Sequence, residues 1–506
     1  MTTQTSDRKA RLYRFGPRDR TGWLLGLGGA QCMTLGAGIF GAGMLLNLGV
    51  PLPVVFAPVL MAAAFAFGRL NGEPVHELLP VVCRWMVTKA SGGTTWFAPT
   101  SGLALGRRSR LTTAELTLPP PLDGLRVIEA QPGSRGQDPF AVVIDSRERT
   151  ATVVVRAQAA QFSLCEPADQ ERLVGQWGDV LAGFCVERGP VGRVRWTEWA
   201  APSGLGEQLA YLDERSPIGA AAAPVAAYRE MVERAGPFSA RHEVLLAVTV
   251  EERRVRRRGK SSRDLELVDA VLEETSVLRQ RLDAAGLGAG EPVSVNGLSA
   301  VLRARLDPFG LPAHGPGPAS LAELVGFVGP ANAGPMAVQA EWDHVRVDRA
   351  FHAAYVICEW PRLEVPANWM EPLLLHAGGI RTVAMHYEPV PPSRSQRRVD
   401  RESVKLASDE EQRSRAGFRI GARHRRAHDE VLERESELVA GYAELEFVGF
   451  VVVTASTYPA LEKSCVEYEQ VAMQCGLELR RLDGRHDLAL ACGLPVGRGL
   501  APRRFA

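Results

Sequence analysis

Residues Glu446 to Ala455 read EFVGFVVVTA, and this stretch decides the fold class that the sequence predicts. It is an apolar, valine-rich run of the length of a strand. A helical pattern follows at Tyr458–Cys475, and another strand pattern follows that helix at Leu477–Leu482. A strand, a long helix and a second strand in immediate succession predict a sheet layer covered by helices.

The same succession of patterns recurs toward the N-terminus without any residue-level period, so a solenoid is not expected. We therefore expect an α+β body of strand–helix–strand units, with a last strand at Asp487–Cys492 closing the final unit. The other predicted strands are Leu125–Ala130, Phe140–Asp145, Ala151–Ala157, Val191–Trp199, His242–Val250, Pro292–Val295, Phe351–Trp360 and Ile380–Tyr387. The other predicted helices are Asp169–Glu187, Arg263–Ala285 and Asn368–His376.

Composition limits the classes of function. The chain has 506 residues, 46% of them hydrophobic, which is enough for several packed domains. Its 59 basic and 58 acidic residues leave a formal net charge of +1, so direct binding of nucleic acid is not expected. The eight cysteines are scattered, with no Cys-x-x-Cys pair and no Cys/His cluster at ligand spacing. We therefore expect no metal and no other cofactor.

The segment between Arg20 and Arg69 contains no Asp, Glu, Lys or Arg. It is long enough for two membrane crossings of about 20 residues each, so we expect a transmembrane helical hairpin over residues 22–68. Trp23–Leu48 and Pro51–Gly68 would be the two spans. A secretory signal peptide, the alternative, would have a shorter apolar region ending at a cleavage site.

Basic residues flank both ends of this hairpin and are absent from its turn, which predicts a cell-membrane protein with both termini and the main body in the cytoplasm. The expected divisions of the chain are a basic cytoplasmic tail at 1–21, the transmembrane hairpin at 22–68, an amphipathic connector at 69–121, the cytoplasmic α+β body at 122–390, a charged helical or mobile arm at 391–440, and a C-terminal β-α-β-β unit at 441–506.

Two of these segments leave alternatives open. The stretch Glu73–Val87 is amphipathic, with Trp85 near its middle, and it either lies on the membrane surface or packs on the body. The arm 391–440 is densely charged, which favours a solvated projection over a dedicated docking element.

An arginine-rich loop follows the predicted strand His242–Val250. It ends in Gly259-Lys260-Ser261, as phosphate-binding loops do, but Arg254 occupies the position of that motif's first glycine, so nucleotide binding is not expected. Ser261 is instead predicted to cap the next helix, with Asp264 three positions on. The basic residues of the loop form a candidate patch for lipid headgroups or an acidic partner, with an unpartnered exposed loop as the alternative: Arg253, Arg254, Arg256, Arg257, Arg258, Lys260 and Arg263.

The sequence contains no catalytic signature. His424 and His428 are four residues apart, but the glutamate of a metalloprotease is missing between them, so a zinc site is not expected. Asp343, His344 and Glu359 are chemically suitable side chains that spacing alone does not bring together. We therefore assign no catalytic residue and do not predict an enzyme.

Several segments, taken in order, resemble one known family. They are the basic tail and hairpin, Val142–Arg156, Arg241–Val250, YVICEWP at Tyr355–Pro361, IRTVAM at Ile380–Met385 and LPVGRGL at Leu494–Leu500. The chain resembles an actinobacterial family of predicted membrane proteins from conjugation-like, type IV secretion-related gene clusters. That family looks like a fusion of the small hairpin membrane subunit of type IV secretion systems to the non-motor N-terminal domain of the secretion ATPase.

The resemblance implies a membrane-anchored structural or assembly component of a translocation machine. Because the sequence ends at Ala506, where the motor domain of the ATPase would begin, it also implies a member without a motor. The implied partners are the lipid bilayer, a separately encoded secretion ATPase, a polytopic channel subunit and further copies of the chain, with a hexamer as the expected homo-oligomer. A type VII secretion membrane component and a membrane-tethered enzyme of unassigned chemistry are the alternatives.

Overall fold

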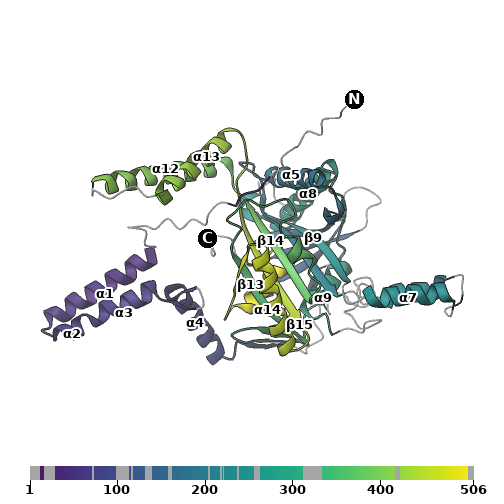
Figure 1. Cartoon of the computed structure of the whole chain (residues 1–506), viewed down its shortest axis with the longest axis horizontal. Helices are drawn as coiled ribbons and strands as arrows, with labels where there is room; N and C mark the ends of the chain where they lie inside the picture. The colour runs from purple at the N-terminus through teal and green to yellow at the C-terminus, as the bar shows by residue number, and fades with distance from the viewer. Residues whose placement is uncertain are drawn as a thin grey trace.

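A computed structural model gives the fold of the chain. It describes residues 12–15, 29–70, 73–98, 113–115, 118–131, 139–157, 162–202, 206–216, 219, 222–235, 239–255, 262–310, 333–415 and 422–499. Its central element is one large sheet of 14 strands, which Figure 1 shows with helices packed on it and helical pairs projecting from it.

All the strand pairings in this sheet are antiparallel. The strand order is β3-β11-β12-β13-β15-β14-β8-β9-β7-β6-β5-β4, and β10 pairs with β7 while β16 pairs with β13. The bounds are β3 Thr95–Phe97, β4 Thr113–Glu115, β5 Leu125–Ala130, β6 Phe140–Asp145, β7 Thr150–Ala157, β8 Val191–Pro202, β9 Ala240–Glu251, β10 Ala289–Pro292, β11 Ala337–Ala340, β12 Val345–Val347, β13 Ala350–Glu359, β14 Ile380–Pro389, β15 Leu445–Ala455 and β16 Glu478–Arg481.

Helices cover both faces of the sheet, as the alternation along β9 shows. Leu245 and Ala247 belong to a core cluster that contains residues of α9 and α15, whereas Leu246 and Val248 belong to one that contains residues of α5 and α8. Successive side chains of a strand point to opposite faces, so both faces are buried. The helices are α5 Pro167–Ala182, α8 Arg263–Ala284, α9 Val295–Leu306, α14 Tyr458–Gln474, which packs on β15, and α15 His486–Gly493.

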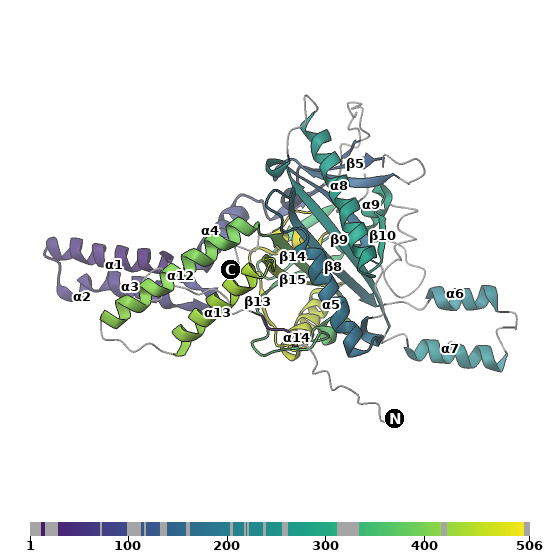
Figure 2. The same cartoon turned by 90° about the horizontal axis from the view of Figure 1, so that it is seen from above.

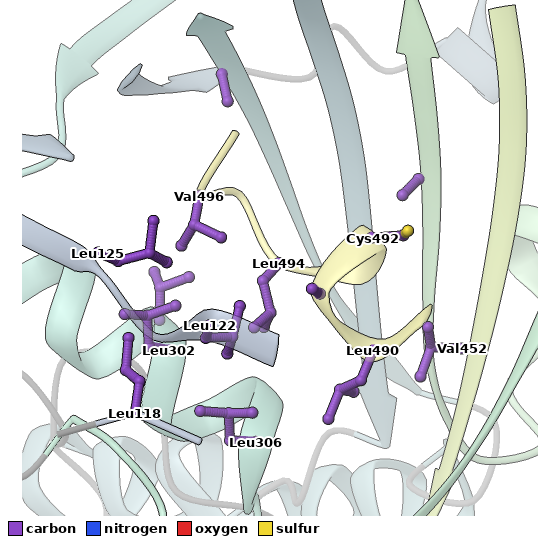
Figure 3. Close-up of a cluster of buried hydrophobic side chains, with 14 of the residues drawn as sticks. Leu118, Leu122, Leu125, Leu302, Leu306, Val452, Leu490, Cys492, Leu494 and Val496 are labelled. Atoms are coloured by element: carbon purple, nitrogen blue, oxygen red, sulfur yellow. The ribbon is translucent and has the colours of Figure 1, made fainter. Parts of the chain in front are cut away.

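The C-terminal segment completes the first of these clusters. Figure 3 shows Leu494 and Val496 beside Leu122 and Leu302, and Leu490 belongs to the same cluster. The chain after α15 is therefore part of the core of the body.

The strands predicted from Leu125 to Ala157 match β5, β6 and β7 within one residue at each end. Two strand predictions were wrong. Asp487–Cys492 lies within the helix α15. The strand predicted at Pro292–Val295 lies instead at Ala289–Pro292 as β10, and the helix α9, which was not predicted, begins at Val295. The predicted body of strand–helix–strand units is corrected as well, because the strands of these units join one large antiparallel sheet.

Three helical pairs project from the body, as Figures 1 and 2 show. The first is α1 Gly29–Asn47 with α3 Ala57–Phe67, joined through the short α2 Leu52–Val55. The second is α6 Gly206–Arg215 with α7 Ala223–Ala235, and the third is α12 Pro392–Arg415 with α13 Ala422–Val439, which occupies the predicted charged arm. At the base of the third pair, Glu444 accepts hydrogen bonds from both Arg398 and Arg434.

The predicted transmembrane hairpin was wrong. Among the described residues no helix is both long and apolar enough to cross a membrane. The second expected span is divided at Phe56 into the four residues of α2 and the eleven of α3, and eleven residues rise only about 16 Å against a hydrocarbon core of about 30 Å. The predictions that depended on this hairpin, a two-helix cell-membrane protein with its termini and body in the cytoplasm, are corrected with it.

The amphipathic stretch at Glu73–Val87 contributes to a helix, α4, at Val75–Ala90. Its Trp85 ring contacts the Trp342 ring of the body edge-on, with the ring centres 5.2 Å apart. Of the two alternatives for this stretch, the contact favours packing on the body.

Candidate functional site: a charge-balanced cleft beside the arginine-rich loop

A cleft of about 360 Å³ opens where β7, β8 and β9 come together, next to the arginine-rich loop. Arg149 precedes β7, Gly192 and Arg193 lie in β8, and Glu251 ends β9. The lining residues are Glu148, Arg149, Thr150, Gly192, Arg193, Thr249, Glu251, Glu252 and Arg253.

The local backbone explains why these side chains meet. The pairing of β8 with β9 shifts register between Val191 and Arg193, at Gly192. A β-carbon at Gly192 would lie 2.4 Å from Cγ of Glu251, so glycine is required for Glu251 to cross β8 there. Arg149 adopts a left-handed conformation with φ of 54°, and its carbonyl accepts a hydrogen bond from the Glu252 amide at 3.0 Å.

Three of the seven residues of the predicted basic patch are described, and each is in an ion pair. Arg253 and Arg254 both donate to Oε2 of Glu251, at 2.6 Å and 2.9 Å. Arg263 lies 3.6 Å from Glu252. Arg256, Arg257, Arg258 and Lys260 lie outside the described residues, so the patch as a whole stays a prediction.

The helix start after this loop differs from the prediction by one residue. The residue before α8 is Ser262, not Ser261, and its side chain makes no capping hydrogen bond. Asp264 instead pairs with Arg126 of β5 at 3.0 Å. The predicted capping box is therefore wrong, because the residue before the helix does not cap it and Asp264 is in an ion pair between α8 and β5.

The charges lining the cleft cancel, since three arginines meet three glutamates. Burial raises the pKa of Glu148, although the nearby Arg193 opposes this. Burial also acts to raise the pKa of Glu251, but the hydrogen bond from Arg253 and the charge of Arg254 outweigh it and the net shift is downward. None of the nine lining residues is a histidine, cysteine or serine, and the polar groups beside the arginines are the glutamate carboxylates and the hydroxyls of Thr150 and Thr249.

The C-terminal segment closes against this region through buried arginines. Arg193 donates to the carbonyl of Gly497, whose φ is 78°, and a β-carbon there would lie 2.1 Å from Oγ1 of Thr152. Arg498 donates to both carboxylate oxygens of the buried Asp145, at 2.6 Å and 2.5 Å. The segment after α15 is thus held by specific hydrogen bonds as well as by apolar packing.

Arg195 lies completely buried beside this segment. It donates to the carbonyls of Ala491 at 3.4 Å and Arg498 at 2.8 Å, and also to that of Leu494. Burial, assisted by the charge of Arg193, lowers the pKa of Arg195 to about 9. A cation here satisfies carbonyl groups at the C-terminal end of α15, where the helix dipole favours positive charge.

Two of the three side chains left unassigned by the sequence meet each other. Asp343 Oδ1 lies 2.9 Å from His344 Nδ1, and Tyr458 donates to Asp343 Oδ2 at 2.6 Å. That hydrogen bond raises the pKa of Tyr458 to about 12, which keeps the phenol protonated and a poor nucleophile near neutral pH. Glu359 is separate from this group and pairs with Arg362.

Sequence reasoning missed most of the cleft. The pairing of Glu251 with Arg253 and Arg254 had a local signal, because the acidic residue immediately precedes the basic run. Arg193 comes from β8 and Glu148 from the turn before β7, and nothing in their neighbouring sequence connects them to the loop.

Among the described residues no three His, Cys, Asp or Glu side chains converge in a way that would hold a metal ion. The chain was compared with family models and with curated proteins, and neither comparison found a match.

Proposed function

We propose that this chain is a non-catalytic assembly subunit that binds a protein partner through the α1/α3 hairpin. The observation that carries the proposal is the apolar surface of this hairpin. Its exposed side chains include Met33, Ile39, Phe40, Met44, Leu46, Leu48, Leu52, Val54, Phe56, Leu60, Met61 and Phe67. Contiguous apolar surface on a projecting element marks a site of interaction.

The packing of the hairpin explains why so many large side chains face outward. Gly38 of α1 lies against α3, where a β-carbon would be 2.5 Å from Cβ of Ala62 and 2.9 Å from the carbonyl oxygen of Pro58. Gln31 donates to the carbonyl of Ala66 at 2.9 Å. Small residues therefore hold the two helices together, and the larger apolar residues remain free to contact a partner.

The family resemblance indicates which partners to test first. It implies a separately encoded secretion ATPase, a polytopic channel subunit and further copies of this chain. The charge-balanced cleft supports a non-catalytic role, because its lining contains no histidine or cysteine and the carboxylate of Glu251 is held in ion pairs by Arg253 and Arg254. The ATPase partner is a proposal that rests on the resemblance alone.

Co-purification tests the proposal. The tagged chain is expressed with the ATPase encoded in the same gene cluster, and the ATPase recovered is measured after size-exclusion chromatography. We expect Phe40→Glu combined with Leu60→Glu to lower recovery at least tenfold, because both charges would be placed in the apolar contact. Leu164→Glu, at a site 81% exposed on the body, is the matched control and should leave recovery unchanged.

Equal recovery with the hairpin variant and the control would refute docking through α1 and α3. The purified chain alone should show no ATP hydrolysis, and Lys260→Ala should leave that result unchanged. Hydrolysis that depends on Lys260 would contradict the assignment of a non-catalytic subunit.

A further inference from the structure

The charged side chains of the cleft differ in how well they are paired. Oε2 of Glu251 accepts hydrogen bonds from both Arg253 and Arg254. Glu252 lies 3.6 Å from Arg263. The charges that β9 and the arginine-rich loop bring to the cleft are therefore largely compensated by each other.

Glu148 and Arg149, neighbours in the turn before β7, lack such partners. Oε2 of Glu148 lies 3.8 Å from a guanidinium nitrogen of Arg193, which is too far for a hydrogen bond. That guanidinium is already engaged, because it donates to the carbonyl of Gly497 and lies 3.5 Å from Glu388. The guanidinium of Arg149 makes no hydrogen bond or ion pair with any other described residue. An acidic and a basic side chain thus line the same cleft with their charges largely uncompensated.

The turn that carries this pair is fixed by its backbone. Oδ1 of Asp145 accepts the amides of Arg147 at 2.8 Å and Glu148 at 3.0 Å. The carbonyl of Arg149 accepts the Glu252 amide, and its φ of 54° is a conformation that residues with a β-carbon rarely adopt. Unusual backbone held by its surroundings is common at ligand sites. The two charges are therefore positioned before any ligand arrives, which lowers the entropy lost on binding.

We propose that the cleft binds a small zwitterion, with an ammonium group on the carboxylate of Glu148 and a carboxylate group on the guanidinium of Arg149. The planar guanidinium can hold a carboxylate through two parallel hydrogen bonds. The side chain of Glu148 is 36% exposed, so a ligand can reach it. A cleft of about 360 Å³ is in the size range of small-molecule sites and suits a compound as large as an amino acid.

The balance of charge in the lining favours a zwitterion over a simple ion. An inorganic anion on Arg149 would face the carboxylates of Glu148, Glu251 and Glu252 and leave Glu148 without a partner. A simple amine on Glu148 would leave Arg149 unpaired in the same way. The guanidinium of Arg253, whose side chain is 76% exposed, adds further donors for the carboxylate end of the ligand. The site lies on the body, so the inference does not depend on docking through the α1/α3 hairpin.

Calorimetric titration of the full chain tests the site with a series of amino acids in which the two charges lie at increasing separation. The series is glycine, β-alanine, γ-aminobutyrate and ε-aminocaproate. For the tightest of the four, the matched probes are the simple amine and the simple carboxylate of the same chain length. We expect the zwitterion to bind at least about tenfold more tightly than either matched probe, because only the zwitterion pairs both side chains.

Two nearly isosteric variants assign the ends of the ligand. Glu148→Gln should weaken binding of the zwitterion about tenfold, to the level of the simple carboxylate. Arg149→Gln should weaken it to the level of the simple amine. Arg147→Gln is the matched control, because it removes a charge from the same turn but Arg147 pairs with Asp123 and does not line the cleft. The control should leave the affinity unchanged, and circular dichroism verifies that all three variants fold.

Three results would overturn the site. The first is that none of the four amino acids binds at millimolar concentration. The second is that the simple carboxylate or the simple amine binds as tightly as the zwitterion of its length, which would make the cleft a site for a single ion. The third is an equal loss of affinity in Arg147→Gln and Arg149→Gln, which would trace binding to the overall charge of the turn.

Discussion

Strand β15 and the α1/α3 hairpin are similarly apolar in sequence and opposite in exposure. Along β15, Phe450 and Val452 are buried in one core cluster, while Val451 and Val453 are buried in the cluster on the other face. Along the hairpin, large apolar side chains such as Phe40 remain open. Apolar composition predicts that a segment will be covered, but only β15 is covered by its own body, whereas the large apolar side chains of the hairpin stay exposed in the described part of the chain.

The largest expected effect is the difference in stability lost when one phenylalanine is truncated in each of these two regions. Phe450→Ala should lower the free energy of unfolding by about 4 kcal/mol, because Phe450 is fully buried and its removal leaves a cavity. Phe40→Ala should change it by less than about 0.5 kcal/mol in the isolated chain, because Phe40 is 76% exposed. Urea unfolding followed by circular dichroism measures both.

The same pair of variants sharpens the comparison once a partner is present. If a protein covers the hairpin, Phe40→Ala should weaken that complex although it leaves the isolated chain intact. A large loss of stability in the isolated Phe40→Ala chain would mean that the hairpin packs on its own body, and the contrast would fail.

A second contrast compares a buried ion pair with an exposed one. Arg498→Met should lower the free energy of unfolding by about 3 kcal/mol, because it leaves the carboxylate of Asp145 buried without its bidentate partner. Arg415→Met on the arm removes a pair with Glu411 whose side chains are 77% and 64% exposed, so it should have an effect below about 0.5 kcal/mol.

The expected rescue distinguishes the charge from the shape of the side chain. Asp145→Asn added to Arg498→Met should recover at least about 1 kcal/mol, because the uncompensated buried charge is then removed. Similar unfolding midpoints for the Arg498 and Arg415 variants would show that the C-terminal segment is not the fixed part of the body described above.

The sequence predicted the strands of the body well where periodicity and composition agreed, as in Phe140–Asp145. It failed at α15, because Leu488, Leu490 and Cys492 alternate like a strand while the alanines between them favour a helix. It also missed α9, whose residues are buried almost all round and therefore lack a polar face. The side chain of Ser294, which accepts the Gly297 amide at 3.1 Å, was the available signal for that helix start.

The charge-balanced cleft was beyond sequence reasoning for a different reason. Glu148, Arg193 and Glu251 are far apart along the chain and meet because β8, β9 and β7 are neighbours in the sheet. The membrane prediction failed because a charge-free run shows that a segment is apolar but does not fix the length of its helices, and the break at Phe56 shortens the second half.

The smallest expected effect is a change of stability with pH, which tests whether water is excluded from the core of the body. His352 lies fully buried in β13, with Nδ1 2.9 Å from Oγ1 of Thr454 and Nε2 2.9 Å from the carbonyl of Leu306. Burial lowers the pKa of His352 to about 4, against an ordinary value of about 6.5 in the unfolded chain. As pH falls below about 6.5, the unfolded chain takes up a proton that the folded chain does not, so stability present above this pH is lost progressively toward pH 4.

Between pH 7 and pH 5 the free energy of unfolding of the wild-type chain should fall by about 2 kcal/mol because of this histidine. His352→Gln removes the titrating group, so this part of the pH dependence should be absent from the variant. Urea unfolding of both chains at pH 8, 7 and 5 measures the difference. The variant can be less stable than the wild type at every pH, but the gap between them should be constant from pH 8 to 7 and narrow by about 2 kcal/mol at pH 5. A constant gap down to pH 5 would mean that His352 becomes protonated in the folded chain, so that water reaches this part of the sheet and the body is less closed than its packing indicates.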